Sequence, residues 1–84
     1  NPYNLNLLLL AAARQLRGGA PDRADDLARR AIEVEPQLGR AWLLLAMAQD
    51  ARGDATSAGA SCENALRWYR SGPEAQTYCS NRTR

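Results

Sequence analysis

The feature that most constrains the fold is a self-similarity at an interval of 34 residues. A shift of the sequence by that interval superimposes Leu9 on Leu43, Leu10 on Leu44, Ala12 on Ala46, Gln15 on Gln49, Gly19 on Gly53, Ala24 on Ala58, Ala31 on Ala65 and Ile32 on Leu66. A fixed period of this length is typical of stacked repeats, in which each unit is one supersecondary element that packs against its neighbours. The sequence therefore predicts a lead-in at residues 1–4, one repeat at 5–38, a second at 39–72, and a capping helix or truncated third repeat with a tail at 73–84.

Each repeat is expected to hold two helices joined by a bend. Apolar and small residues recur at helical spacing in the first part of each unit, among strong helix formers. Gly18-Gly19 ends the first helix, and Pro21 opens the next one at a position where its missing N–H is not needed. Because Gly53 falls on Gly19, the triplet Arg52-Gly53-Asp54 is predicted to be the second bend, with its aspartate as a helix cap, and not an adhesion motif. We therefore expect an all-α chain of about five helices.

Alanines are expected to form the contact between the helices of a repeat. Ala12 and Ala46 on the first helices should face alanines of the second helices, namely Ala24, Ala31, Ala58 and Ala65. Small side chains let two helix axes approach toward the lower end of the usual range of about 8–10 Å. Larger apolar residues are expected to fill the remaining core: Leu8, Ile32, Trp42, Leu45 and Leu66.

This arrangement resembles the tetratricopeptide repeat (TPR) family. The resemblance is carried in the second unit by Trp42, Leu45, Gly53-Asp54, Ala58 and Ala65, and in the first unit by Ala24, Ala31 and Pro36, all in one unbroken register. It covers residues 5–72 and the start of a third unit. The resemblance implies a right-handed α-solenoid of antiparallel helix hairpins, whose concave wall is formed by the first helix of each pair.

What the resemblance implies for function is a protein–protein interaction module that binds a peptide or helix of a partner in that concave groove. The implied groove residues are Asn6, Leu9, Ala13, Leu16, Arg17, Arg40, Leu43, Leu44, Met47, Asp50, Glu74, Thr77 and Tyr78. The wall is mostly apolar with two arginines, so the expected partner is an apolar segment with some acidic character. Because the chain starts without Met, we expect it to belong to a larger scaffold or an assembly or secretion factor.

Two other functions stay open. Leu7, Leu8 and Leu10 on the first helix have no preceding unit to cover them, and exposed apolar patches of this kind tend to pair, which favours a homodimer or larger homo-oligomer. A nucleic-acid-binding helical domain is less favoured, because eleven arginines stand against nine acids for a net charge of only +2, and a repeat of this period is not what a DNA reader requires.

Catalysis, cofactors and metal ions are not expected. The chain has no His, so a Cys nucleophile would lack its usual base, and two Cys alone are too few ligands for a metal site. The acids Asp25, Asp26, Glu33 and Glu35 are expected on a solvated helix face. Membrane insertion is not expected either, because the apolar run at residues 7–13 is far shorter than the ~20 residues that span a bilayer.

The cysteines leave two readings open. Cys62 lies on the second helix of the second unit, and Cys79 lies on the helix expected to pack against it. A bridge across this interval would stabilise the fold by on the order of 3 kcal/mol and would indicate an oxidising compartment such as the bacterial periplasm. The alternative is two buried thiols in a cytoplasmic protein.

Overall fold

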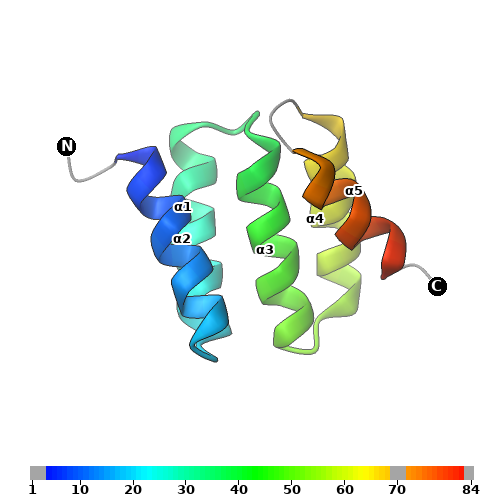
Figure 1. Cartoon of the computed structure of the whole chain (residues 1–84), viewed down its shortest axis with the longest axis horizontal. Helices are drawn as coiled ribbons and strands as arrows, with labels where there is room; N and C mark the ends of the chain where they lie inside the picture. The colour runs from blue at the N-terminus through cyan, green and yellow to red at the C-terminus, as the bar shows by residue number, and fades with distance from the viewer. Residues whose placement is uncertain (1–3, 69–71, 83–84) are drawn as a thin grey trace.

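The structure, a computed structural model, describes residues 4–68 and 72–82, and these form five α-helices without a β-strand (Figure 1). The helices are α1 (Leu5–Arg17), α2 (Pro21–Val34), α3 (Gly39–Ala51), α4 (Ala55–Arg67) and α5 (Gly72–Asn81). The predicted all-α class and the number of helices are confirmed. Residues 1–3 of the predicted lead-in, residues 69–71 at the end of the second predicted repeat, and residues 83–84 of the predicted tail lie outside the described residues.

The helix boundaries follow from local backbone chemistry. Asn4 caps α1 by accepting a hydrogen bond from the Leu7 N–H at 3.2 Å. Gly53 has a φ of +85°, in the left-handed region that a side chain disfavours, and it turns the chain between α3 and α4. Asp54 then accepts a hydrogen bond from the Ser57 N–H at 3.2 Å and caps α4. The predicted bend with its aspartate cap is confirmed.

Helices α1 to α4 lie side by side, and each runs opposite to the one before it (Figure 1). Each of these helices contacts its neighbour in sequence, and α1 also contacts α3. Helix α5 crosses over at the other end, where it contacts α4 and α3 (Figure 1). None of the helices within residues 4–68 and 72–82 combines the length and the apolar character that crossing a membrane requires.

The alanines are the most deeply buried side chains of the core. The two on the first helices of the repeats, Ala12 and Ala46, are 0% exposed. The same holds for the alanines of the second helices, namely Ala24, Ala28, Ala31, Ala58 and Ala65. Ala12 shares a core cluster with Ala28, and Ala46 shares another with Ala65. The expected burial of the alanine contacts is confirmed.

One expected core residue is not in the core. Leu66 is 47% exposed on α4, so its predicted burial is wrong. Its counterpart by the 34-residue interval, Ile32, packs against the same cluster as Trp42. The residue that corresponds to Trp42 on α5 is Gln76, which is exposed. Leu66 therefore lacks the large apolar neighbour that Ile32 has.

Candidate functional site

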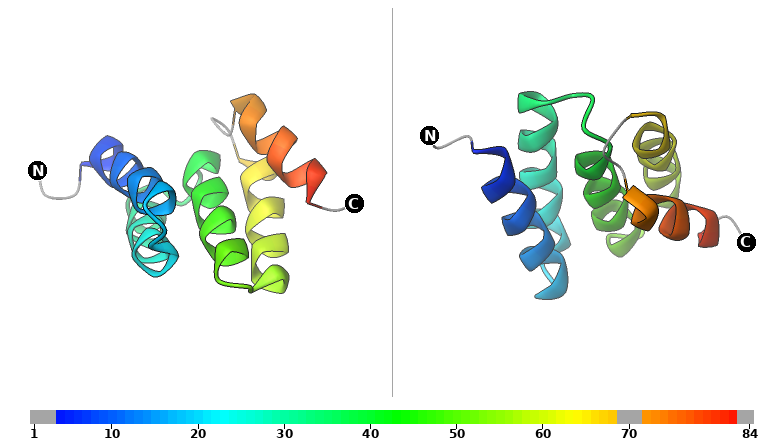
Figure 2. Two further views of the ribbon diagram at one scale, coloured as in Figure 1. Left: turned by 60° about the horizontal axis from the view of Figure 1, so that its bottom comes forward. Right: turned by 45° about the horizontal axis from the view of Figure 1, so that its top comes forward.

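A hollow of about 200 Å³, here called the inner hollow, lies between α1, α3 and α5. Figure 2 shows that α1 and α5 lie on the same side of the molecule, over α2 and α4. The residues that border the hollow are Ala13, Leu16, Arg17, Arg40, Leu43, Leu44, Met47 and Glu74. All of them belong to the set that the resemblance implies for a groove, and the structure brings them together from three helices.

The inner hollow has an apolar floor and a charged rim. Leu43 and Leu44 are buried at its floor. At the rim, Arg40 on α3 donates a hydrogen bond through Nη1 to Oε2 of Glu74 on α5 at 3.2 Å. Arg17, at the last turn of α1, is exposed and has no ion-pair or hydrogen-bond partner among residues 4–68 and 72–82. The arrangement can therefore receive an apolar group and still leaves one free positive charge beside it.

The other residues of the implied set lie elsewhere. Thr77 and Tyr78 border a neighbouring hollow of about 490 Å³ on α5, which shares Glu74 with the inner hollow. Leu9 is half-buried and packs against two core clusters, and Asn6 is exposed near the start of α1. Neither of them borders the inner hollow. Both lie near the start of α1, whereas the hollow is bordered by the end of that helix, at Ala13, Leu16 and Arg17.

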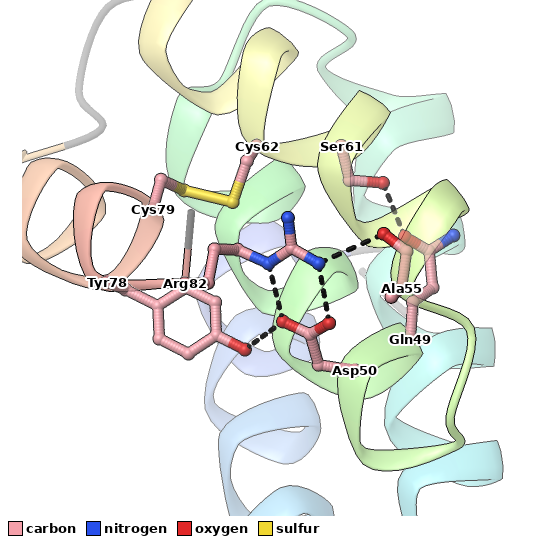
Figure 3. The surroundings of a disulfide bond; sticks show 8 residues. All are labelled: Gln49, Asp50, Ala55, Ser61, Cys62, Tyr78, Cys79 and Arg82. Carbon is pink, nitrogen blue, oxygen red and sulfur yellow. Dashed lines mark hydrogen bonds and ion pairs between the residues drawn. A yellow bond between two sulfur atoms is a disulfide. The ribbon is translucent and has the colours of Figure 1, made fainter. Parts of the chain in front are cut away.

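Asp50 does not border the inner hollow either, because it is engaged by the end of the chain. Arg82 Nε and Nη2 each donate to Asp50 at 2.8 Å, and the Tyr78 hydroxyl donates to it at 2.5 Å (Figure 3). The hydrogen bonds from Arg82 hold the pKa of Asp50 below its ordinary value, and the bond from Tyr78 adds to this. Burial, followed by the hydrogen bond to Asp50, raises the pKa of Tyr78 to about 12. Asp50 thus joins α3 to α5.

The sequence interpretation missed Arg82. The 34-residue interval places Asp50 where the first unit has Leu16, and Arg82 where the second unit has Ala48. An acid and a base at two positions that are apolar one repeat earlier are the signal that could have found this ion pair.

Cys62 on α4 and Cys79 on α5 form a disulfide, with their Cα atoms 5.7 Å apart (Figure 3). Of the two arrangements expected for the cysteines, the structure has the bridge and not two free thiols. Both cysteines border a second hollow of about 430 Å³, here called the outer hollow. The exposed Leu66 borders it as well.

A separate group of charges ties α2 to the end of α3. Asp25 is only 5% exposed, so its predicted place on a solvated face is wrong. Its carboxylate accepts from Arg29 at 2.5 Å and from Arg52 at 3.0 Å, and Arg52 also pairs with Asp22 at 2.8 Å. The arginine of the Arg52-Gly53-Asp54 triplet is thus bound within the fold, because α2 presents two acids to it.

Searched against family models, curated proteins and solved structures, the chain has no match. Among the residues that the structure describes, no three His, Cys, Asp or Glu side chains gather closely enough to hold a metal ion. The proposed function therefore rests on the inner hollow and on the 34-residue interval in the sequence.

Proposed function

We propose that this chain is a protein-binding module of the tetratricopeptide type, whose inner hollow receives an apolar segment of a partner protein with acidic residues beside it. The two hairpins and α5 would then stack as a right-handed solenoid, with α1, α3 and α5 on the concave side. The observation that carries the proposal is the convergence of α1, α3 and α5 on one apolar hollow, at whose rim Arg17 is unpaired within residues 4–68 and 72–82.

The chemistry of the hollow selects the kind of segment. An engineered cavity of about 150 Å³ with apolar walls is large enough for benzene, so a hollow on this scale suits one aromatic or branched side chain. Met47 is half-buried at the hollow, and methionine adapts its shape to different apolar groups. The Arg17 side chain has no partner among the residues that the structure describes, so a carboxylate of the bound segment would meet it without displacing any of these residues.

We propose binding and not catalysis. The chain has no His, and the two least exposed acids near arginines, Asp25 and Asp50, are engaged in ion pairs within the fold. The Cys62–Cys79 disulfide supports an oxidising compartment, such as the periplasm, because disulfides are rare where thiols are kept reduced. A scaffold or an assembly or secretion factor is the kind of protein to which such a module would belong.

The experiment first selects peptides that bind the wild-type chain from a random-peptide phage library. It then compares the binding of these peptides to variants of two arginines of α1. We expect the selected peptides to combine Leu, Ile or Met with Asp or Glu. In fluorescence anisotropy with those peptides, Arg17→Glu should weaken binding by about tenfold or more, because it replaces attraction by repulsion. Arg14→Glu is the matched control, since Arg14 is also exposed in the last turn of α1 but does not border the hollow.

Equal losses in the two variants, or selection of basic peptides, would contradict the proposal. Far-UV circular dichroism of both variants checks that α1 stays helical. Leu43 is unsuitable for this test, because it is only 2% exposed and belongs to the core cluster between α3, α4 and α5.

A second candidate function is self-association through α1. Leu7 is 62% exposed and Leu10 is 47% exposed. The corresponding residues of α3, Ala41 and Leu44, are 0% and 6% exposed and lie in clusters with alanines of α2. The same face that α2 covers on α3 is therefore uncovered on α1, and a second copy of the chain is one occupant that could cover it.

A further inference from the structure

Helix α5 is attached to the rest of the molecule in a different way from the other helices. It has 10 residues, of which only Ala75 and Cys79 are buried. Helices shorter than about 12–15 residues are marginal in water when isolated. The helical state of α5 therefore depends on the contacts that hold it against α3 and α4.

The disulfide joins α4 to α5 at the positions where α2 and α3 are joined by apolar packing. By the 34-residue interval, Cys62 corresponds to Ala28 and Cys79 corresponds to Leu45. Ala28 and Leu45 belong to one core cluster, which packs α2 against α3. A covalent bond between α4 and α5 has thus replaced the hydrophobic contact that joins the earlier pair of helices.

The other attachments of α5 are mostly polar. Asp50 binds Arg82 and Tyr78, where the corresponding positions of the first junction, Leu16 and Leu44, are apolar. The ion pair between Arg40 and Glu74 joins side chains that are 45% and 68% exposed, and pairs this exposed contribute little net stability. Without the disulfide, α5 would keep the burial of Ala75 and Cys79 and the packing of Tyr78 against the same cluster. It would also keep the partly exposed Asp50 network and the hydrogen bond from Arg82 to the Ala55 carbonyl.

The junction between α3 and α4 does not need the disulfide. Ala46 and Ala65 are fully buried in one cluster, which α5 also enters with Ala75 and Cys79. The Ser61 hydroxyl donates to Gln49 Oε1 at 2.6 Å, and both side chains are buried (Figure 3). Two further core clusters join α1, α2 and α3 without a residue of α5, so these three helices keep their packing when α5 leaves.

The outer hollow gives a small thiol access to the disulfide. Its volume is about 430 Å³, and Cys62 and Cys79 both border it. Gly59 and Ala60 border it beside larger side chains, which are Thr56, Glu63, Leu66 and Arg82. Cys62 and Cys79 are only 5% and 3% exposed, so a reductant in this hollow reaches the sulfur atoms when α5 moves locally away from α4.

We propose that Cys62–Cys79 is a thiol–disulfide exchange site that controls whether α5 is attached. A dithiol that enters the outer hollow attacks one sulfur through its thiolate, breaks the S–S bond and forms a mixed disulfide. Its second thiol then attacks the mixed disulfide, so that the dithiol leaves as a disulfide, and Cys62 and Cys79 gain two electrons and two protons as thiols. Helix α5 then detaches, whereas α1 to α3 stay packed.

Detachment would change the inner hollow, and this consequence rests on the proposed function. Glu74 leaves the rim with α5, and Arg40 loses its ion-pair partner. The hollow becomes more open and more basic, so its preference for acidic segments increases. The disulfide state thereby regulates what the hollow binds.

The experiment is amide hydrogen exchange of the full chain, with and without dithiothreitol. Closure of an interval of 17 residues favours the attached state by on the order of a hundredfold in the loop-entropy model. We expect the amides of α5 to exchange faster by about that factor after reduction, and those of α1 to α3 to change by less than about threefold. The double variant Cys62→Ala with Cys79→Ala should show fast exchange in α5 without reductant and no response to it.

Two results would overturn the proposal. One is unchanged exchange in α5 after reduction, and the other is equal acceleration in α1 to α3. Should the double variant fail to fold, reduction of the native chain gives the same readout. No ligand takes part in this measurement, so its failure and a failure of the peptide-binding test are distinguishable.

Discussion

At the scale of single residues, the partners of Asp50 and Tyr78 decide their chemistry. The pKa of Asp50 lies below its ordinary value of 3.8, so its carboxylate stabilises the fold above that pH, and the stabilisation is lost as the pH falls through the lowered value. The pKa of Tyr78 is raised from 10.0 to about 12, so its hydroxyl stabilises the fold below pH 10 and that contribution is lost as the pH rises toward 12.

An alkaline titration tests this pair. In the difference between the tyrosinate absorbance of the wild type and of Tyr78→Phe, we expect a midpoint near pH 12. Asp50→Asn should lower the midpoint without returning it to 10.0, because burial is the larger cause of the shift and remains. Glu74→Gln, on the same helix but not in contact with the hydroxyl, is the control. A wild-type midpoint at the ordinary value would show that Tyr78 is neither buried nor hydrogen-bonded to Asp50 in solution, and equal midpoints in the wild type and Asp50→Asn would show that the hydrogen bond does not form.

At the scale of helices, the bends are where single residues matter most. Gly53 has a φ of +85°, and a Cβ added there would meet no atom within 4 Å, so any cost of a side chain is a cost of backbone conformation alone. Gly59 lies inside α4, and a Cβ there would lie 3.5 Å from Arg82 Nη1, which is an ordinary contact. Replacement by alanine is therefore expected to change the free energy of unfolding in opposite directions at Gly53 and at Gly59.

We expect Gly53→Ala to lower the free energy of unfolding by about 1–2 kcal/mol, since alanine disfavours the left-handed region. Gly59→Ala should raise it by up to about 1 kcal/mol, because alanine is the better helix former. Urea denaturation followed by circular dichroism measures both. If the two variants shift the midpoint in the same direction, the assignment of Gly53 to the bend or of Gly59 to the helix interior is wrong.

The helices and bends could be predicted because their causes are local. Glycine at Gly19 and Gly53 turns the chain wherever it stands, and the spacing of the alanines places Ala12 and Ala46 on an inward face before any partner is known. Leu16, Arg17 and the other residues of the inner hollow were expected on one wall because of the resemblance to a known repeat, and not from a local cause. Leu9 lies outside the hollow because the position of a residue along a helix, and not only its face, decides which neighbour it meets.

At the scale of the whole molecule, the face of α1 that carries Leu7 and Leu10 is exposed. Under the second candidate function, light scattering of the chain, whose mass is 9.2 kDa, should give a larger apparent mass that falls when Leu7→Glu and Leu10→Glu are combined. Leu66→Glu is the matched control, because Leu66 and Leu10 are both 47% exposed but lie on different helices. A monomer mass at every concentration would exclude self-association and leave the peptide-binding proposal.

The amino-acid sequence by itself determined the helices, the bends and the buried alanines, because backbone preference and helical periodicity act within a few residues. Only the tertiary structure decided that Cys62 is bonded to Cys79, that Asp50 faces Arg82, and that Leu66 is left uncovered. The physical reason is that each of these outcomes depends on which side chain the next helix presents at the point of contact. At α5 that helix carries a cysteine, a tyrosine and a glutamine where the earlier repeat carries leucines and a tryptophan, so the junction is covalent and polar instead of apolar.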